Sequence, residues 1–170
     1  GIAAAAIGDA DNHVAITANE FVYGDLGGIA GAIGGDDSTL VITTHEDVVS
    51  SDGVGIAAGS FGDRNEITVN AGGSITADDA GILAMVAGDE TQVDITTEGT
   101  VMVLDGVGIF STTIGNDGTT NIVTNGGVEA SESGVVGVNT GGSTDILLNN
   151  YVVAGGTFGA FALGGGDGFA

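Results

Sequence analysis

The chain has 170 residues, of which 34 are glycine and 23 are aspartate or glutamate, and its single lysine or arginine leaves a formal net charge of -22 at pH 7. This excess of carboxylates repels phosphate backbones and anionic lipid surfaces, which excludes nucleic-acid binding by counterion release and electrostatic attachment to a membrane. The absence of cysteine excludes a disulfide framework, a thiolate metal site and a cysteine nucleophile.

Residues 1–7 (GIAAAAI) open the chain with an apolar run that is too short to cross a bilayer and carries no basic residue. The run therefore predicts neither a signal peptide nor a transmembrane helix, and no membrane insertion is expected. Hydrophobic residues make up 42% of the chain and the mean hydropathy is +0.39, which predicts a folded domain rather than an acidic disordered tail.

A motif of 25 to 27 residues recurs along the whole chain, and each copy is anchored by an apolar residue that follows a glycine. The anchors are Ile2, Ile29, Ile56, Ile82, Ile109, Val135 and Ala160. Glycine also stands six residues after every anchor, and a small residue stands two residues after every anchor. Small side chains in one column are expected where a strand packs in a crowded interior.

Each repeat predicts three short strands separated by turns of glycine, aspartate, asparagine and threonine. The first begins at the anchor, the second is marked in the first repeat by Val14 and Ile16, and the third by Val22. Apolar residues recur two positions apart, which is strand spacing, and no helical spacing persists. We therefore predict an all-β, right-handed, single-stranded parallel β-helix (β-solenoid) with three short strands per coil and about six coils, forming one domain over residues 1–170.

The pattern G-I-x-A-x-x-x-G-D … V-x-I-T-T-x-G-x-V, from Gly81 to Val101, resembles the coil repeats of bacterial autotransporter passengers and related haemagglutinin-type exoproteins. The resemblance extends over essentially the whole chain and implies a β-helix at the cell surface or outside the cell. It implies no particular activity, because these families share coils and place function in differing loops. The repeat enters and leaves in the same phase without a capping sequence, as expected of a segment of a longer solenoid or of a subunit that stacks end to end.

Aspartate recurs seven residues after the anchor. The candidate metal ligands in this column are Asp9, Asp36, Asp63, Asp89 and Asp167. Carboxylates stacked at the spacing of adjacent coils would repel by about 1 kcal/mol per pair at the dielectric constant of bulk water. Two interpretations stay open: solvated turn residues that are screened by salt and helped by backbone N–H groups, or a ladder that binds calcium, the one cofactor that the sequence suggests.

The positions one and three after the anchor are predicted to face outward, and almost none is polar. The candidate interface residues among them are Leu83, Met85, Phe110, Val138, Phe161 and Leu163. The outward positions of the second strand, such as Thr17, Thr43 and Thr68, are mostly polar. A strand that is apolar on both faces is normally covered on both, so we expect a partner here, and another copy of this chain is the expected one.

The predicted function is structural: an extracellular, self-associating β-solenoid that forms a filament, sheath or matrix element by end-to-end stacking and lateral apolar contacts. The alternatives are the stalk segment of a secreted or autotransported adhesin and a polysaccharide-active β-helix enzyme. Catalysis is not expected, because cleavage of acidic polysaccharides needs cationic groups and Arg64, between Asp63 and Glu66, suggests a local ion pair. Hydrolysis by paired carboxylates stays open, and no catalytic residue is assigned.

Overall fold

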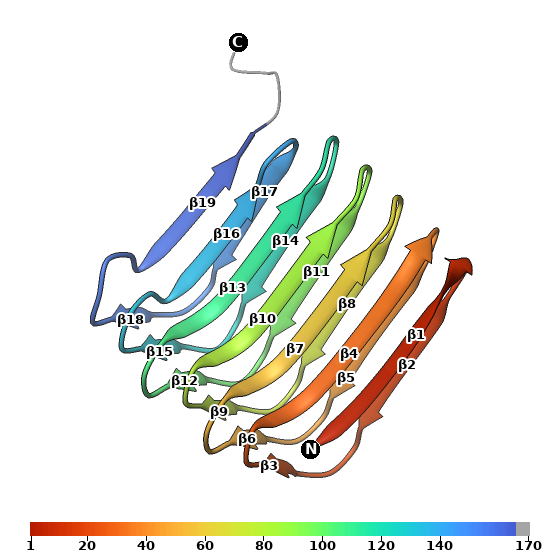
Figure 1. Cartoon of the computed structure of the whole chain (residues 1–170). Coiled ribbons are helices and arrows are strands. Elements are labelled where there is room, and N and C mark those ends of the chain that lie inside the picture. Colours follow the sequence, from red (N-terminus) through yellow and green to blue (C-terminus); the bar gives the residue numbers. More distant parts are fainter. Residues whose placement is uncertain (166–170) are drawn as a thin grey trace.

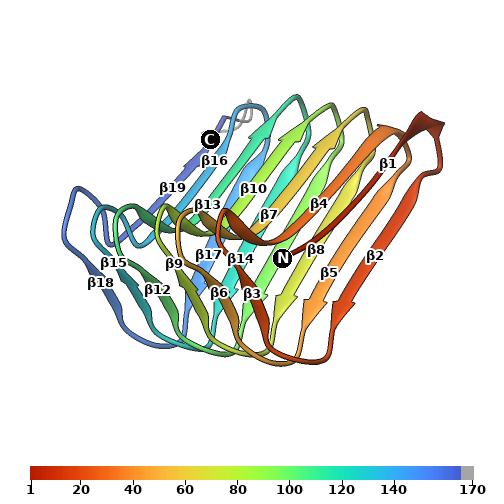
Figure 2. The same cartoon turned by 60° about the horizontal axis from the view of Figure 1, so that its bottom comes forward.

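The computed structural model describes residues 1–165, which form nineteen strands and no helix. The strands build a parallel β-solenoid of about six coils with three sheets, as predicted. The strands of one sheet run up the front, the chain returns behind them, and the coils advance from right to left, so the winding is right-handed (Figure 1). The narrowest sheet closes the third side between the two wider ones (Figure 2).

Each sheet collects the equivalent strand of every coil. Sheet A contains β1 (Ile2–Ala10), β4 (Gly27–Asp36), β7 (Val54–Phe61), β10 (Ala80–Ala87), β13 (Val107–Ile114), β16 (Val135–Asn139) and β19 (Ala160–Gly164). Sheet B contains β2 (His13–Ala18), β5 (Thr39–Thr44), β8 (Glu66–Ala71), β11 (Gln92–Thr97), β14 (Thr119–Thr124) and β17 (Ser143–Leu148). Sheet C contains β3 (Val22–Gly24), β6 (Val48–Ser50), β9 (Ile75–Ala77), β12 (Val101–Val103), β15 (Val128–Ala130) and β18 (Val152–Ala154).

The strand register follows the sequence repeat. The anchor Ile82 of β10 lies opposite Ile56 of β7 and Ile109 of β13, so a column in the sequence is a ladder in space. The first coil departs from this rule, because the register shifts between Ile7 and Ala10 of β1. The ladders are therefore continuous from the second coil onward and offset at the first turn.

The interior is filled by stacked aliphatic side chains. Ile82, Ile109 and Ile122 are completely buried, and buried residues alternate with half-buried outward ones along β14, as period-two alternation requires. The small residue two after the anchor faces sheet B across this interior: a methyl group at Gly31 would lie 2.7 Å from Cδ1 of Leu40. Lack of space in the interior thus explains why the residue two positions after each anchor is small.

The two glycine columns have different physical causes. A methyl group at Gly81, before an anchor, would overlap the Val101 side chain and approach the carbonyl oxygen of Gly108 to 2.5 Å, so close packing at the corner requires glycine. Gly35 and Gly62, six after an anchor, have φ angles of 107° and 116°, which glycine adopts without strain. Within the described part of the chain no helix is long and apolar enough to cross a membrane.

Candidate interaction surface

The outer face of sheet A presents two central ladders of outward residues. The first contains Ala3, Ala30, Ala57, Leu83, Phe110, Val136 and Phe161. The second contains Ala5, Ala32, Gly59, Met85, Thr112, Val138 and Leu163. We call these fourteen residues the apolar face. All six candidate interface residues belong to it, so the structure brings them together on one surface, and their role in an interface stays a prediction.

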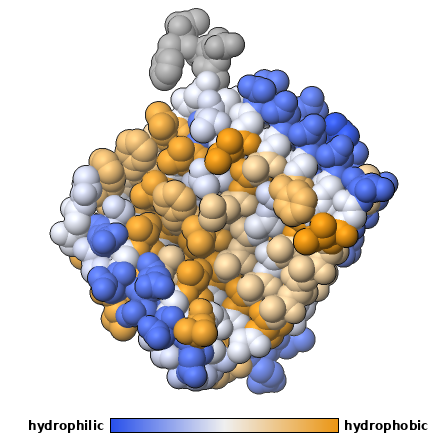
Figure 3. All heavy atoms as spheres, in the orientation of Figure 1, coloured by the Kyte–Doolittle hydropathy of each residue, from blue (hydrophilic) through white to orange (hydrophobic). Residues whose placement is uncertain are grey.

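No residue of the apolar face is charged, although the chain carries 23 carboxylates. Met85 is 52% exposed and Leu163 is 50% exposed, so large apolar side chains meet solvent here. Hydrophobic residues cover most of this side of the molecule, and hydrophilic residues gather at its margins, where the strands of sheet A begin and end (Figure 3). Sheet B differs, since its outward ladder includes Asp94 and Asn121. The apolar face is thus an uncharged surface between hydrophilic margins.

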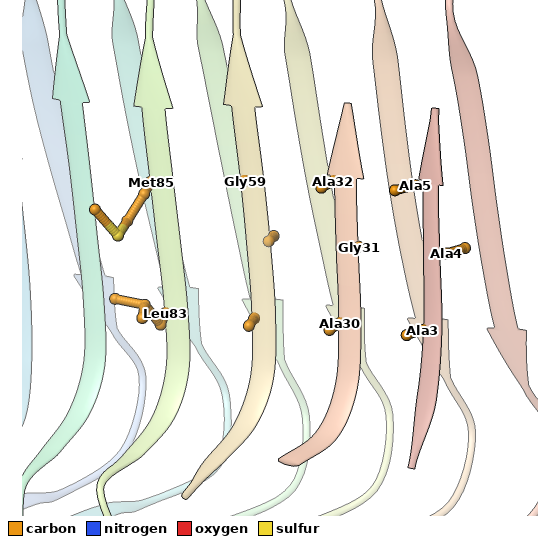
Figure 4. Close-up of a pocket in the computed structure, with 11 residues that line it drawn as sticks. Ala3, Ala4, Ala5, Ala30, Gly31, Ala32, Gly59, Leu83 and Met85 are labelled. Atoms are coloured by element: carbon orange, nitrogen blue, oxygen red, sulfur yellow. The ribbon is translucent and has the colours of Figure 1, made fainter. Parts of the chain in front are cut away.

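A shallow groove of about 440 Å³ lies in one half of this face. Its lining is Ala3, Ala4, Ala5, Ala30, Gly31, Ala32, Ala57, Ala58, Gly59, Leu83 and Met85. Figure 4 shows the short side chains of β1, β4 and β7 beside the longer Leu83 and Met85 of β10. The groove therefore arises because the outward residues are alanine or glycine in three coils and become large in the fourth. The sequence predicted Leu83 and Met85 at an outward surface, but it did not predict the groove beside them.

The margin after sheet A contains the aspartate ladder. The backbone N–H of Asp63 donates to Oδ1 of Asp36 (3.0 Å), that of Asp89 donates to Oδ1 of Asp63 (2.9 Å), and that of Asn116 donates to Oδ1 of Asp89 (2.8 Å). Each of these carboxylates thus accepts a backbone hydrogen bond from the next coil. A backbone N–H donor to each carboxylate stabilises its charge and offsets part of the repulsion along the ladder.

One candidate metal ligand, Asp9, is out of register with this ladder, because the register shift in β1 places Ala10 opposite Asp36. The candidate Asp167 lies outside the described residues. In residues 1–165 no three acidic or histidine side chains are grouped in a way that could hold a metal ion. Calcium binding therefore stays a prediction that a melting experiment must test.

Arg64 forms an ion pair, but with a residue of the preceding coil. Its Nε and Nη2 donate to the two carboxylate oxygens of Asp37 at 2.7 and 2.8 Å, whereas the sequence suggested Asp63 or Glu66 as partners. Arg64 pairs with Asp37 because the stacking of coils brings the two side chains together.

The hydrogen bond from Arg64 lowers the pKa of Asp37 in the folded chain. The pair therefore stabilises the fold at a pH above the pKa that Asp37 has in the unfolded chain. This contribution is lost as the pH falls through the lower pKa of Asp37 in the folded chain. Both side chains are about half exposed, so solvent screens the pair.

A polar ladder inside the same turn was not predicted. Asn65 is buried, its amide donates to the carbonyl oxygen of Gly62 (3.1 Å), and its Oδ1 accepts from the backbone N–H of Ser38 (2.8 Å). In the first coil Asn12 donates to the carbonyl oxygen of Gly34 (2.6 Å). The available signal was an amide or hydroxyl residue three places after the turn glycine at Ser38, Asn65 and Thr91, and four places after it at Asn12. The bonds between Ser38 and Asn65 and between Asn12 and Gly34 join adjacent turns.

Replacing Asp63 by Asn should raise the melting temperature in low salt by about 2–4 °C, because it removes one charge flanked by two others and keeps the Oδ1 acceptor for Asp89. Differential scanning calorimetry in chelator, in NaCl and in calcium at matched ionic strength measures the effect. Asp63→Ala is the control, which loses charge and acceptor together and should melt below Asp63→Asn. A loss of stability of Asp63→Asn in calcium, with none in chelator, would instead identify Asp63 as a calcium ligand.

Comparison of the chain with protein-family models, with curated proteins and with solved structures found no match. The parallel β-solenoid with three sheets is therefore established by its own strand pairing, and the function must be argued from its surfaces.

Proposed function

We propose that this chain is a structural, self-associating β-solenoid, located at the cell surface or outside the cell, whose apolar face packs against another copy in a filament, sheath or matrix element. The observation that carries the proposal is the absence of charge from the fourteen residues of the apolar face in a chain with 23 carboxylates. An acidic chain that leaves one broad face uncharged and apolar has a surface suited to burial.

Stacking along the solenoid axis supplies the second contact of the proposed assembly. In residues 1–165 the outer edges of β1 and β19 pair with no further strand, so their backbone groups can pair with another coil at the same spacing as inside the molecule. In the proposed filament that coil belongs to a second copy, so that the coils and the apolar face continue as one column.

Replacing Leu83 and Phe110 by Asp should abolish lateral association, because each large apolar side chain at the contact would become an unpaired buried charge. Analytical ultracentrifugation should show at least about a hundredfold weaker lateral association, corresponding to about 3 kcal/mol. Electron microscopy should show single thin fibres where the wild type bundles, because the strand edges are unchanged.

The matched control adds two charges to sheet B, by Thr43→Asp and Thr96→Asp in one outward ladder, where Asn70 lies between them. This control lowers the net charge by the same amount as the double replacement of Leu83 and Phe110 by Asp, and it should leave bundling intact. A wild-type chain that sediments as a 16.3 kDa monomer at high concentration in salt would contradict the proposed function.

The second candidate is the stalk segment of a secreted or autotransported adhesin, whose binding region lies elsewhere in a longer chain. It is favoured by the resemblance of the pattern from Gly81 to Val101 to the coils of autotransporter passengers. A complete gene that encodes many further coils and a translocator barrel would favour the stalk. A short gene would favour the subunit.

A further inference from the structure

The apolar face has a step in height at its middle strand. In β1, β4 and β7 its residues are alanine or glycine, and they form the groove. In β10 they are Leu83 and Met85, which stand above that level (Figure 4). In β13 the residue next to Leu83 is the still larger Phe110. A flat apolar partner could not contact both halves, because it would rest on the high half and leave a void over the low one. Voids in a packed interface forfeit dispersion contacts and weaken it.

We propose that two copies of this chain pair through their apolar faces in a two-fold dimer with oppositely directed solenoid axes. The inference rests on the proposed function, since it specifies the lateral contact. The two-fold axis lies between the faces, parallel to the strands, and passes over β10. Each coil then faces the coil that lies equally far on the other side of β10.

The first ladder becomes complementary in this arrangement. Ala57 faces Phe110 of the second copy, and Ala30 faces Val136 of the second copy. Leu83, on the axis, faces its own equivalent. Every opposed pair away from the axis thus combines one small and one larger side chain, and in this ladder only Leu83, on the axis, meets a residue of its own size.

The second ladder follows the same rule. Ala32 faces Val138 of the second copy, Gly59 faces Thr112, and Met85 meets its own equivalent. The groove of each copy is therefore filled by the high half of the other. The contact is isologous, so both grooves are filled at once.

The other face-to-face two-fold dimer fits poorly. With the axis parallel to the solenoid and centred on the face, every coil would face the same coil of its partner with the strand direction reversed, so that Phe110 would meet Thr112 and Ala57 would meet Gly59. The large side chains from β10 onward would then meet one another and set the separation of the sheets, and both grooves would remain empty.

The area and charge of the face also suit a second copy. The outer side of sheet A, with seven strands about 4.8 Å apart and on average about eight residues long, covers roughly 700 Å² per copy, and the apolar face makes up about half of it. A dimer that buries the whole outer side in both copies hides about 1,400 Å², which is the size of a specific interface. The fourteen residues bring no charge that would need desolvation. Because acidic margins flank the face in both copies, added salt should strengthen the dimer.

A size swap between the two halves tests the arrangement. Ala57→Phe makes the groove more apolar but fills the space of Phe110 from the second copy, and Phe110→Ala removes that side chain. Each single variant should dissociate at least about tenfold more readily by sedimentation equilibrium in 0.5 M NaCl, as expected for overpacking and for a cavity. The double variant Ala57→Phe/Phe110→Ala should return to within about threefold of the wild type, since each contact again joins one small and one large residue.

This rescue cannot arise inside one molecule. Residues 57 and 110 are separated by Leu83 in the same ladder and lie about two strand spacings, roughly 10 Å, apart, a distance at which effects normally add. Stronger association of Ala57→Phe, or an additive loss in the double variant, would overturn the arrangement while leaving self-association standing. A wild-type chain that stays monomeric while a hydrophobic dye saturates the groove would overturn both proposals and assign the groove to a small apolar ligand.

Disulfide trapping gives an independent readout, because the chain has no cysteine of its own. Met85→Cys, on the axis, should form disulfide-linked dimers by itself under mild oxidation. Ala57→Cys and Phe110→Cys should cross-link when mixed and much less when each is alone. Efficient cross-linking of Ala57→Cys with Gly59→Cys would indicate the arrangement with parallel solenoid axes and contradict the proposal.

Discussion

Replacing Gly81 by Ala should destabilise the fold by about 3 kcal/mol, the upper part of the range for overpacking a close-packed interior. The added methyl group would overlap the Val101 side chain and crowd the carbonyl oxygen of Gly108. The backbone oxygen belongs to the parallel ladder of sheet A and cannot rotate away. Urea denaturation followed by circular dichroism should show a lower midpoint, and the melting temperature should fall by about 6–12 °C.

Gly59→Ala is the matched control, since Gly59 lies in the neighbouring strand of the same sheet. A methyl group there would have its nearest neighbour, the carbonyl oxygen of Met85, at 3.9 Å, which is an ordinary contact. Its stability should change by less than about 0.5 kcal/mol. Equal losses in both variants would mean that intrinsic strand preference, rather than packing at the corner, governs the glycine column.

Replacing Ile122 by Ala should also lower the free energy of unfolding by about 3 kcal/mol, within the range for truncating a fully buried isoleucine. Ile122 is completely buried and stacks between Ile95 and Ile146 of the adjacent coils. The truncation leaves a cavity that two stacked neighbours cannot both fill. Chemical denaturation at fixed salt concentration measures the loss.

Val123→Ala is its control, because Val123 is the next residue of β14 and points outward. It should lose less than about 1 kcal/mol. A large loss at Val123 with little at Ile122 would mean that β14 is displaced by one residue, since such a shift exchanges the two faces of a strand.

Most of the fold could be predicted because the chain repeats. A period of 25 to 27 residues with apolar residues at alternate positions determines which residues stack, and Ile56, Ile82 and Ile109 indeed lie side by side. The same argument placed Leu83 and Phe110 on the outside of sheet A, where the structure has them. Where the environment of a residue is set by the equivalent residues of the adjacent coils, its place in the coil follows from its number of residues after the anchor.

The sequence by itself therefore determined the class of fold, the three strands of each coil, the strand register and the uncharged face. Other features were decided only by the tertiary structure. They depend on the conformation of particular turns or on the relative height of side chains from several coils. Three features arise in the turns. The register shift separates Asp9 from Asp36. Arg64 adopts a left-handed backbone conformation (φ 55°) and pairs with Asp37. The groove beside Leu83 exists because three coils with short side chains adjoin a fourth with long ones, and such a step is visible only when the coils are stacked.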